Sequence, residues 1–122
     1  MTSDTYRIYA VRYAHHDRRA HENFLQGDPH DTAPMPLDYF VWAVVGESRT
    51  FVFDTGFDKA MAQQRGREFL LPPGEGLQAI GIDPASVKDV VISHMHYDHT
   101  GNNGICGRAS SAGADKSLEI VV

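Results

Sequence analysis

Cysteine is almost missing from this sequence: Cys106 is the only one among 122 residues. No disulfide can therefore form within the chain, which fits a reducing compartment. No apolar run approaches the length of a membrane span, and the first residues lack the apolar core of a signal peptide. Basic residues are too few to balance the acidic ones, and the net charge of −5 favours neither nucleic acid nor a membrane surface as partner. We expect a cytoplasmic protein.

Histidine is absent after His99, but three of the seven histidines lie together just before that point. Residues 93–102 read Ser-His-Met-His-Tyr-Asp-His-Thr-Gly-Asn and follow the apolar segment Val90–Ile92. This pattern predicts a buried strand that ends in a loop carrying metal ligands. A lone histidine usually binds nothing, but four ligand-type side chains at i, i+2, i+4 and i+5 after an apolar strand rarely occur by chance.

The spacing favours two metal ions rather than one. Residues two apart on an extended segment face the same side, so we expect His94 and His96 to bind a first ion. Asp98 and His99 are adjacent and would bind a second ion where the chain turns at 100–102. Imidazole and carboxylate ligands suit zinc, and also iron or manganese. Two such ions about 3.5–4 Å apart are typical of hydrolytic sites.

The remaining pattern predicts a layered α/β domain with the ligands at the carboxyl end of a strand. We expect strands at 6–13, 37–45, 50–53 and 90–92, and a strand fragment at 118–122, with a hairpin turn at 46–49. We expect helices at 59–71 and 76–80, with Asp58 capping the first, and a brief turn at 85–88. Because both faces of 37–45 are apolar, we expect this strand to be covered on both sides, with Trp42 in the core.

A long polar stretch, residues 14–36, lies between the first two strands and is interrupted at most by a short helix around 18–25. Loops of this length tend to be functional or mobile. One interpretation is a lid over an active site, with Phe24 and Leu25 as its apolar contacts; the other is a solvated loop. Its four histidines are not expected to be ligands, because a tighter cluster already supplies them; they are His15, His16, His21 and His30.

A carboxylate follows the strand 50–53, in the sequence Asp54-Thr55-Gly56. If the metal site exists, Asp54 is a candidate to support it, either by binding the second ring nitrogen of a ligand histidine or by holding the backbone of the ligand loop. The alternative is that Asp54 only caps the next turn.

The residues from His94 to His99 resemble the HxHxDH signature of the metallo-β-lactamase superfamily, and Thr100-Gly101-Asn102 resembles its usual continuation. The upstream residues Tyr13–Phe24 and 28–31, with the stretch Phe53–Asp58, are similar to the N-acyl homoserine lactonase group, whose members act in quorum quenching. The resemblance extends from Tyr6 to Asn102. The HxHxDH motif is highly specific for the superfamily, whereas the upstream similarity is moderately specific for lactonases.

The resemblance implies an αβ/βα sandwich that binds two zinc ions. His94 and His96 would match ligands of the first site, and Asp98 and His99 ligands of the second. A metal-bridging hydroxide would attack a lactone carbonyl, and Asp98 would orient this nucleophile or shuttle a proton. A small lactone or ester is the implied substrate. A glyoxalase-II-like thioesterase, a phosphodiesterase or another ester hydrolase of the same fold would share this metal loop.

The chain also departs from the family pattern. The superfamily's remaining ligands, two histidines and a bridging aspartate, lie further downstream, where this sequence has only Asp115. We interpret residues 1–103 as the N-terminal half of the sandwich and 104–122 as an atypical tail rich in glycine, alanine and serine. A truncated chain, a fragment gene or a shifted reading frame would each give this pattern. Cys106 and the upstream histidines have no spacing that would complete the site.

Two hypotheses remain open. One is a dinuclear zinc hydrolase of the lactonase kind, complete in a longer parent or in an assembly of copies. The other is a catalytically incompetent fragment that binds metal loosely, or an interaction module. Half of a sandwich would leave one sheet face uncovered, which favours aggregation or a homo-oligomer.

Overall fold

The computed structural model describes residues 5–102, 106 and 119–121. Its strands are β1 (Arg7–His16), β2 (Leu37–Val45), β3 (Thr50–Phe53), β4 (Glu68–Phe69), β5 (Asp89–Val91) and β6 (Glu119–Val121). Its helices are α1 (Ala20–Asn23), α2 (Lys59–Arg65), α3 (Pro73–Ala79) and α4 (Tyr97–Thr100), and Pro84–Ser86 form the 3-10 turn η1. No helix in this part of the chain is long and apolar enough to cross a membrane.

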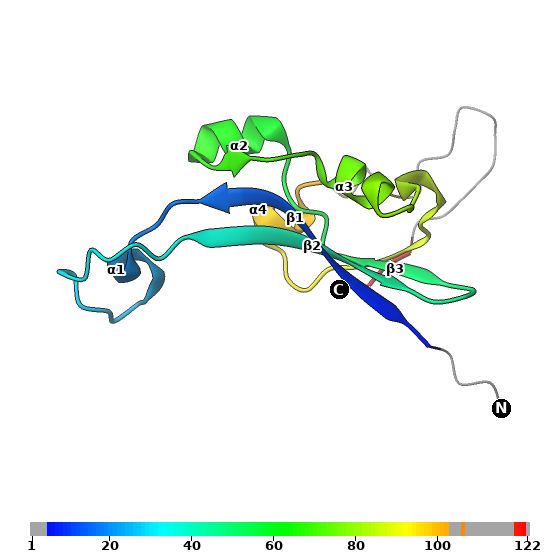
Figure 1. Ribbon diagram of the computed structural model, residues 1–122, viewed down its shortest axis with the longest axis horizontal. Helices are drawn as coiled ribbons and strands as arrows, with labels where there is room; N and C mark the ends of the chain where they lie inside the picture. The colour runs from blue at the N-terminus through cyan, green and yellow to red at the C-terminus, as the bar shows by residue number, and fades with distance from the viewer. Residues whose placement is uncertain (1–4, 103–105, 107–118, 122) are drawn as a thin grey trace.

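The strands form one mixed sheet in the order β4-β1-β2-β3-β5-β6. The pairs from β4 to β3 are antiparallel, whereas β3, β5 and β6 run parallel. Helices α2 and α3 lie over one face of the sheet (Figure 1). The predicted α/β class is therefore confirmed, and the carboxyl ends of β3 and β5 meet at one edge, which is where the loops carrying Asp54 and the histidines begin.

The hairpin follows directly from its sequence. Apolar and aromatic residues alternate along β2 and β3, and the turn between them closes with a hydrogen bond from Gly46 N–H to the Arg49 carbonyl, 2.8 Å. Strand β1 is longer than predicted, and its pairing with β2 shifts register between Arg12 and Ala14. This irregularity accommodates Tyr13, which is fully buried.

The core lies between the sheet and the helices, because only one side chain in two can face that side of a strand. Val41 and Ala43 of β2, Val52 of β3 and Val90 of β5 point to this side and are fully buried, as is Leu77 of α3. Gly76 brings α3 close to β1: a Cβ there would lie 2.5 Å from Val11 Cγ1.

The prediction that β2 is covered on both faces was wrong, and so was the prediction of a core position for Trp42. Trp42 lies between Val41 and Ala43 and therefore points away from the helices, where its side chain is 42% exposed. Helices α2 and α3 do not cover this second face, although Asp98 and His99 of the loop after β5 lie beside Phe40 and Trp42 at a cavity there. Trp42 pairs in register with Ala10 of β1 and Phe53 of β3, so the exposed surface is continuous across three strands.

The predicted helix 59–71 is shorter than expected. Asp58 caps its start as predicted, accepting a hydrogen bond from Met61 N–H, but the helix ends at Arg65. Gly66 follows in the left-handed conformation at φ 67° and closes the helix as a C-cap. Residues 68–69 then pair with β1 as β4. Single-sequence periodicity did not reveal this short edge strand.

The other predicted elements are present, and their bounds differ from the predicted ones by a few residues. Helix α3 begins at Pro73, whose ring suits the first helical position. The brief turn is η1, where Asp83 caps Ala85 N–H, and the last strand fragment is β6. The interpretation of residues 104–117 as a structureless tail falls, except for Cys106, outside the described residues.

Candidate metal centre

The ligand loop begins where β5 ends and finishes in the short helix α4. His94, His96 and Asp98 each offer a ligand atom, and these atoms lie within 4.8 Å of one another. The rings of His94 and His96 meet edge to face with centroids 4.6 Å apart. Both histidines are exposed and Asp98 is half-buried, so the donors face solvent.

His99 lies beside this group. Its ring centroid is 3.8 Å from that of His94, and its Nε2 atom is 3.3 Å from Asp98 Oδ2. The sequence paired His94 with His96 and Asp98 with His99, whereas the structure also brings Asp98 to the first pair. The loop bends at 93–96 rather than continuing as a strand, and this bend gathers the side chains at one place.

Asp54 holds the ligand loop through hydrogen bonds. It is buried, with 5% exposure, and adopts the left-handed conformation at φ 63°, which asparagine and aspartate tolerate better than other residues that carry a side chain. Its Oδ1 atom accepts a hydrogen bond from Ser93 N–H at 2.8 Å, and its Oδ2 atom lies 2.7 Å from His99 Nδ1. The carboxylate therefore contacts both the loop backbone and one candidate ligand ring.

A second set of hydrogen bonds fixes the end of α4. Thr55 donates from its backbone N–H to the His99 carbonyl at 2.8 Å, and its hydroxyl oxygen accepts from Asn102 N–H at 3.1 Å. Gly101 allows this close approach, because a Cβ there would lie 2.5 Å from the Gly56 carbonyl oxygen. Thr55 and Gly56 of the loop after β3 thus pack against Gly101 and Asn102 at the end of the ligand loop.

Tyr13 is a supporting residue that the sequence did not indicate. Its hydroxyl donates to the Asp98 carbonyl at 3.1 Å, and its ring meets Phe57 edge to face. Burial, and then the nearby Asp98 charge, raise the pKa of Tyr13 far above its usual range, so the hydroxyl keeps its proton and remains a donor. Nothing in a strand sequence distinguishes such a tyrosine from an ordinary core residue.

The part of the chain that the structure describes forms two cavities near the ligand loop. One of about 290 Å³ opens beside Asp98 and His99 and has the side chains of β2 as its apolar wall. Its other lining residues are Tyr13, Leu37, Asp38, Tyr39, Phe40, Trp42 and Asp54. A larger cavity of about 930 Å³ lies between the helices and has no member of the ligand group in its lining. The smaller cavity is therefore the one that adjoins the candidate ligand group.

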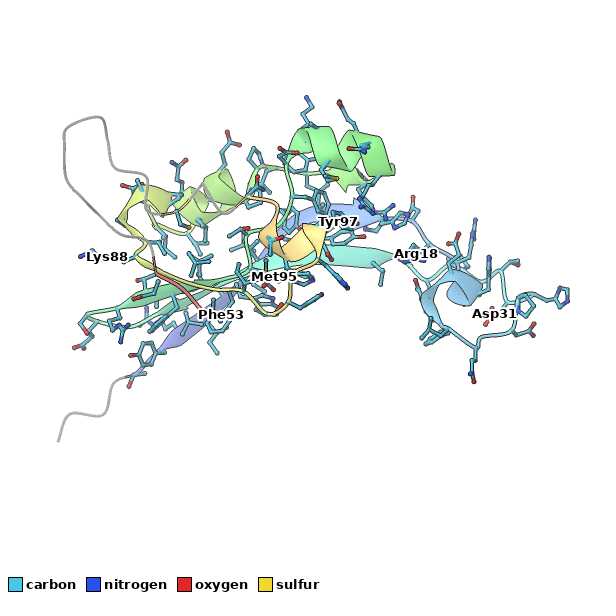
Figure 2. All side chains as sticks on the ribbon, turned by 180° about the vertical axis from the view of Figure 1, so that it is seen from behind. Arg18, Asp31, Phe53, Lys88, Met95 and Tyr97 are labelled. Atoms are coloured by element: carbon cyan, nitrogen blue, oxygen red, sulfur yellow. The ribbon has the colours of Figure 1, made fainter. Side chains whose placement is uncertain are left out.

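The proposed lid lies away from the ligand loop in this conformation. Residues 17–36 form an arm that projects beyond the ends of β1 and β2, with Asp31 far from Met95 and Tyr97 (Figure 2). Phe24 is 58% exposed and Leu25 is fully exposed. Neither is covered here, so their role as lid contacts stays a prediction.

The arm has a defined backbone. Its two sides are joined by hydrogen bonds from Ala20 N–H to the Ala33 carbonyl, 2.9 Å, and from Met35 N–H to the Arg18 carbonyl, 2.8 Å. Among the described residues, the candidate metal group includes neither its histidines nor Cys106. Cys106 is buried, which raises its pKa to about 11 and keeps the thiol neutral.

Residues 34–116, more than half of the chain, match the model of the Metallo-beta-lactamase superfamily. The chain belongs to this superfamily. The match includes β2, β3 and the whole ligand loop, and it agrees with the resemblance that the HxHxDH residues carry.

Known lactonases are among the similar proteins. N-acyl homoserine lactonase AttM of Azorhizobium caulinodans is 64% identical over 28 residues, which are 23% of this chain and 11% of that protein. An N-acyl homoserine lactone hydrolase, solved with N-hexanoyl-L-homoserine at its catalytic metal centre, is 18% identical, with a TM-score of 0.56 over 86% of this chain and 46% of its own. The dizinc quorum-quenching lactonase AidC is 16% identical, with a TM-score of 0.57 over 81% of this chain and 36% of its own.

These solved structures share the fold of this chain. The chain spans less than half of their length and about a tenth of the length of the curated relative. The sheet with its helices thus corresponds to one part of the larger fold.

Proposed function

We propose that this chain carries part of the site of a zinc-dependent hydrolase that opens the ring of N-acyl homoserine lactones. The observation that carries the proposal is the convergence of His94, His96 and Asp98 within 4.8 Å, with His99 held beside them by Asp54. The similar lactonases, one of them a dizinc enzyme, support this substrate and this metal.

The donor set fits zinc. Two imidazoles and a carboxylate are ligands that zinc accepts in tetrahedral sites, and catalytic zinc sites commonly keep three protein ligands. The Nδ1 atom of His99 is occupied by Asp54, so its Nε2 atom remains the one available to a metal. Zinc, when bound, supplies a Lewis acid that polarises a carbonyl and allows water to react near neutral pH.

The chain's own residues have distinct tasks in the ring opening. Water adds its oxygen to the lactone carbonyl carbon, the bond from that carbon to the ring oxygen breaks, and the ring oxygen takes a proton to become a hydroxyl. In this proposal Asp98 accepts the proton from water and returns it to the ring oxygen. The products are the open-chain carboxylate and one released proton.

The apolar wall of the smaller cavity suits the acyl part of such a substrate. Leu37, Phe40 and Trp42 line it together with Asp98 and His99. Phe24 and Leu25 would act as lid contacts if the arm folds over this cavity with substrate bound. In that case Phe24→Ala with Leu25→Ala raises KM, by up to about 100-fold or more, since each loses up to about 1.5–3 kcal/mol of apolar burial.

The test is proton release from a homoserine lactone by the zinc-loaded chain, measured together with metal content. His94→Ala with His96→Ala abolishes both, whereas His30→Ala, a histidine on the arm, changes neither. Thioester and phosphodiester probes are run beside the lactone, and faster turnover of either one overturns the choice of substrate.

The same experiment distinguishes the lactonase from the alternative, a metal-binding fragment. Four described donors leave two zinc ions short of four ligands each, which favours the hypothesis of a metal-binding fragment without catalysis. Substoichiometric, easily chelated zinc without turnover would support that hypothesis and overturn lactonase activity for this chain. A chain that binds no zinc at all would overturn both lactonase activity and the metal-binding fragment, and would leave the interaction module.

A further inference from the structure

We propose that Ser93 is a positioning residue that, together with Asp54, fixes which nitrogen of His94 and of His99 carries the proton. In this arrangement both rings carry hydrogen on Nδ1 and present Nε2 toward the ligand group. The inference deepens the proposed function, because it names the atoms offered to the metal, but it concerns the metal-free chain.

The Ser93 hydroxyl lies at the centre of a small hydrogen-bond network. Its Oγ atom is 2.9 Å from each carboxylate oxygen of Asp54. It is also 3.1 Å from His94 Nδ1 and 3.2 Å from His99 Nδ1. A single hydroxyl therefore touches the buried carboxylate and two of the four candidate ligands.

Counting donors decides the direction of each bond. An ionised carboxylate can only accept, so the single proton of the Ser93 hydroxyl belongs to its bond with Asp54. The hydroxyl oxygen is then an acceptor toward the histidines, and the bond with His94 requires a proton on His94 Nδ1. The 2.7 Å contact from His99 Nδ1 to Asp54 Oδ2 requires a proton on His99 Nδ1 for the same reason.

The opposite arrangement is unfavourable. If Ser93 donated to His94 Nδ1 instead, its oxygen would face two carboxylate oxygens at 2.9 Å with no proton between them. Acceptors in such contact repel, and the buried Asp54 would lose a hydrogen bond that its burial makes costly to replace. The burial of Asp54 thus determines the tautomer of His94, a ring it does not touch in any hydrogen bond shown by the structure.

The network also explains why Asp54 occupies a strained backbone conformation. At φ 63° its carboxylate faces Ser93 and His99 together, at the carboxyl ends of two paired parallel strands. Such strain persists where the surrounding contacts require it, and it is common at functional sites. Ser93 extends the reach of this one carboxylate to a second ring.

Nitrogen NMR of ¹⁵N-histidine-labelled, metal-free chain tests the inference, in alkaline buffer where the rings are neutral. We expect Nδ1–H for His94 and His99 in the unmodified chain. In Ser93→Ala we expect a mixture of tautomers at His94, with His99 unchanged because Asp54 still binds it. Ser93→Thr keeps the hydroxyl and should restore the original His94 signal, and Ser86→Ala, which removes a hydroxyl bound elsewhere at Asp83, should change neither ring.

An Nε2–H signal for His94 in the unmodified chain would overturn the inference, and so would an unchanged His94 tautomer in a folded Ser93→Ala variant. Zinc titration supplies a second readout: Ser93→Ala should bind about 10–100-fold more weakly than Ser93→Thr, the usual cost of losing a group that orients a ligand. Failure of the unmodified chain to bind zinc would count against the proposed function alone, since the NMR result does not depend on metal.

Discussion

The imidazole of His99 and the carboxylate of Asp54 are joined by a 2.7 Å hydrogen bond between Nδ1 and Oδ2, although 45 positions separate them in the sequence. Strands β3 and β5 are parallel neighbours, so their carboxyl ends meet at one edge of the sheet. The loop after β3 supplies the buried carboxylate and the loop after β5 supplies the ring. The candidate site is therefore built across two loops that the sheet brings together.

The substitution Asp54→Asn tests this connection. An asparagine at this position would tolerate the left-handed backbone and keep the size of the side chain, but its amide group would face the donors of Ser93 and His99. We expect a loss of about 1–3 kcal/mol in the free energy of unfolding, with a parallel loss of zinc affinity, measured by urea denaturation and metal titration. A variant as stable as the original chain would show that the carboxylate charge is unimportant to the fold.

Gly101→Ala should disrupt the contact between the two loops. The added Cβ would lie 2.5 Å from the Gly56 carbonyl oxygen and 2.7 Å from the Tyr97 carbonyl oxygen, and both are backbone atoms that cannot simply rotate away. Overpacking of this kind costs about 1–3 kcal/mol, visible as a lower urea midpoint.

Gly74→Ala is the matched control for that substitution. A Cβ at Gly74 would meet its nearest neighbour, Pro84 Cγ, at an ordinary 3.8 Å. In helix α3 the change should leave stability the same or raise it by about 0.4–1 kcal/mol. Equal losses at both glycines would contradict the close approach of the loops.

The uncovered face of the sheet predicts self-association that depends on Trp42. Trp42→Thr keeps a side chain that suits a strand and removes a large apolar group that is 42% exposed. We expect weaker self-association in sedimentation velocity at nearly unchanged thermal stability.

Substitution of the neighbouring residue, Val41, should instead lower the stability of the chain. Val41 is fully buried on the helix side of the same strand, so Val41→Thr would bury a hydroxyl and should cost about 1–3 kcal/mol in the free energy of unfolding. If Trp42→Thr destabilised the chain as strongly as Val41→Thr, then the outer face would be covered in solution by something other than a weakly bound copy.

The cluster at the base of the arm predicts a pH-dependent stability. Hydrogen bonds that His15 donates to Asp38 and then to Asp17 raise the pKa of His15 above its ordinary value of 6.5. The same contact with His15, followed by Arg12, lowers the pKa of Asp38 below its ordinary 3.8. Glu68 lies opposite His15 in the pairing of β1 with β4 and adds a further acidic group.

The signs of these shifts define the pH window. The contribution of His15 is complete below pH 6.5 and is lost as the pH rises through its raised value in the folded chain. The contribution of Asp38 is present above pH 3.8 and is lost as the pH falls through its lowered value. Thermal melts should thus show added stability between these limits that His15→Gln removes. His21→Gln, on the arm, should leave the profile unchanged, and a flat profile in the unmodified chain would contradict the assignment.

The local sequence pattern was sufficient to predict an element wherever the residues that determine this element lie close together in the sequence. The hairpin of β2 and β3 was predicted with the bounds that the structure has, because alternating apolar residues and a short turn specify it locally. The cap at Asp58 was likewise predictable, since it depends on neighbours a few positions away; that the loop residues are metal ligands stays a prediction. The end of the helix was predicted wrongly, because Gly66 could close it or merely weaken it.

Tertiary structure decided what depends on distant partners. The outer position of Trp42 depends on which face of the sheet the helices cover, and both faces of β2 are apolar in sequence. The positions of Tyr13 under Asp98 and of Ser93 between Asp54 and His94 arise from strand order and from a bend in the loop. The sequence by itself determined the chemistry of the donors, because residue type sets it; the fold decided their grouping and orientation, because only the sheet brings the ends of β3 and β5 together.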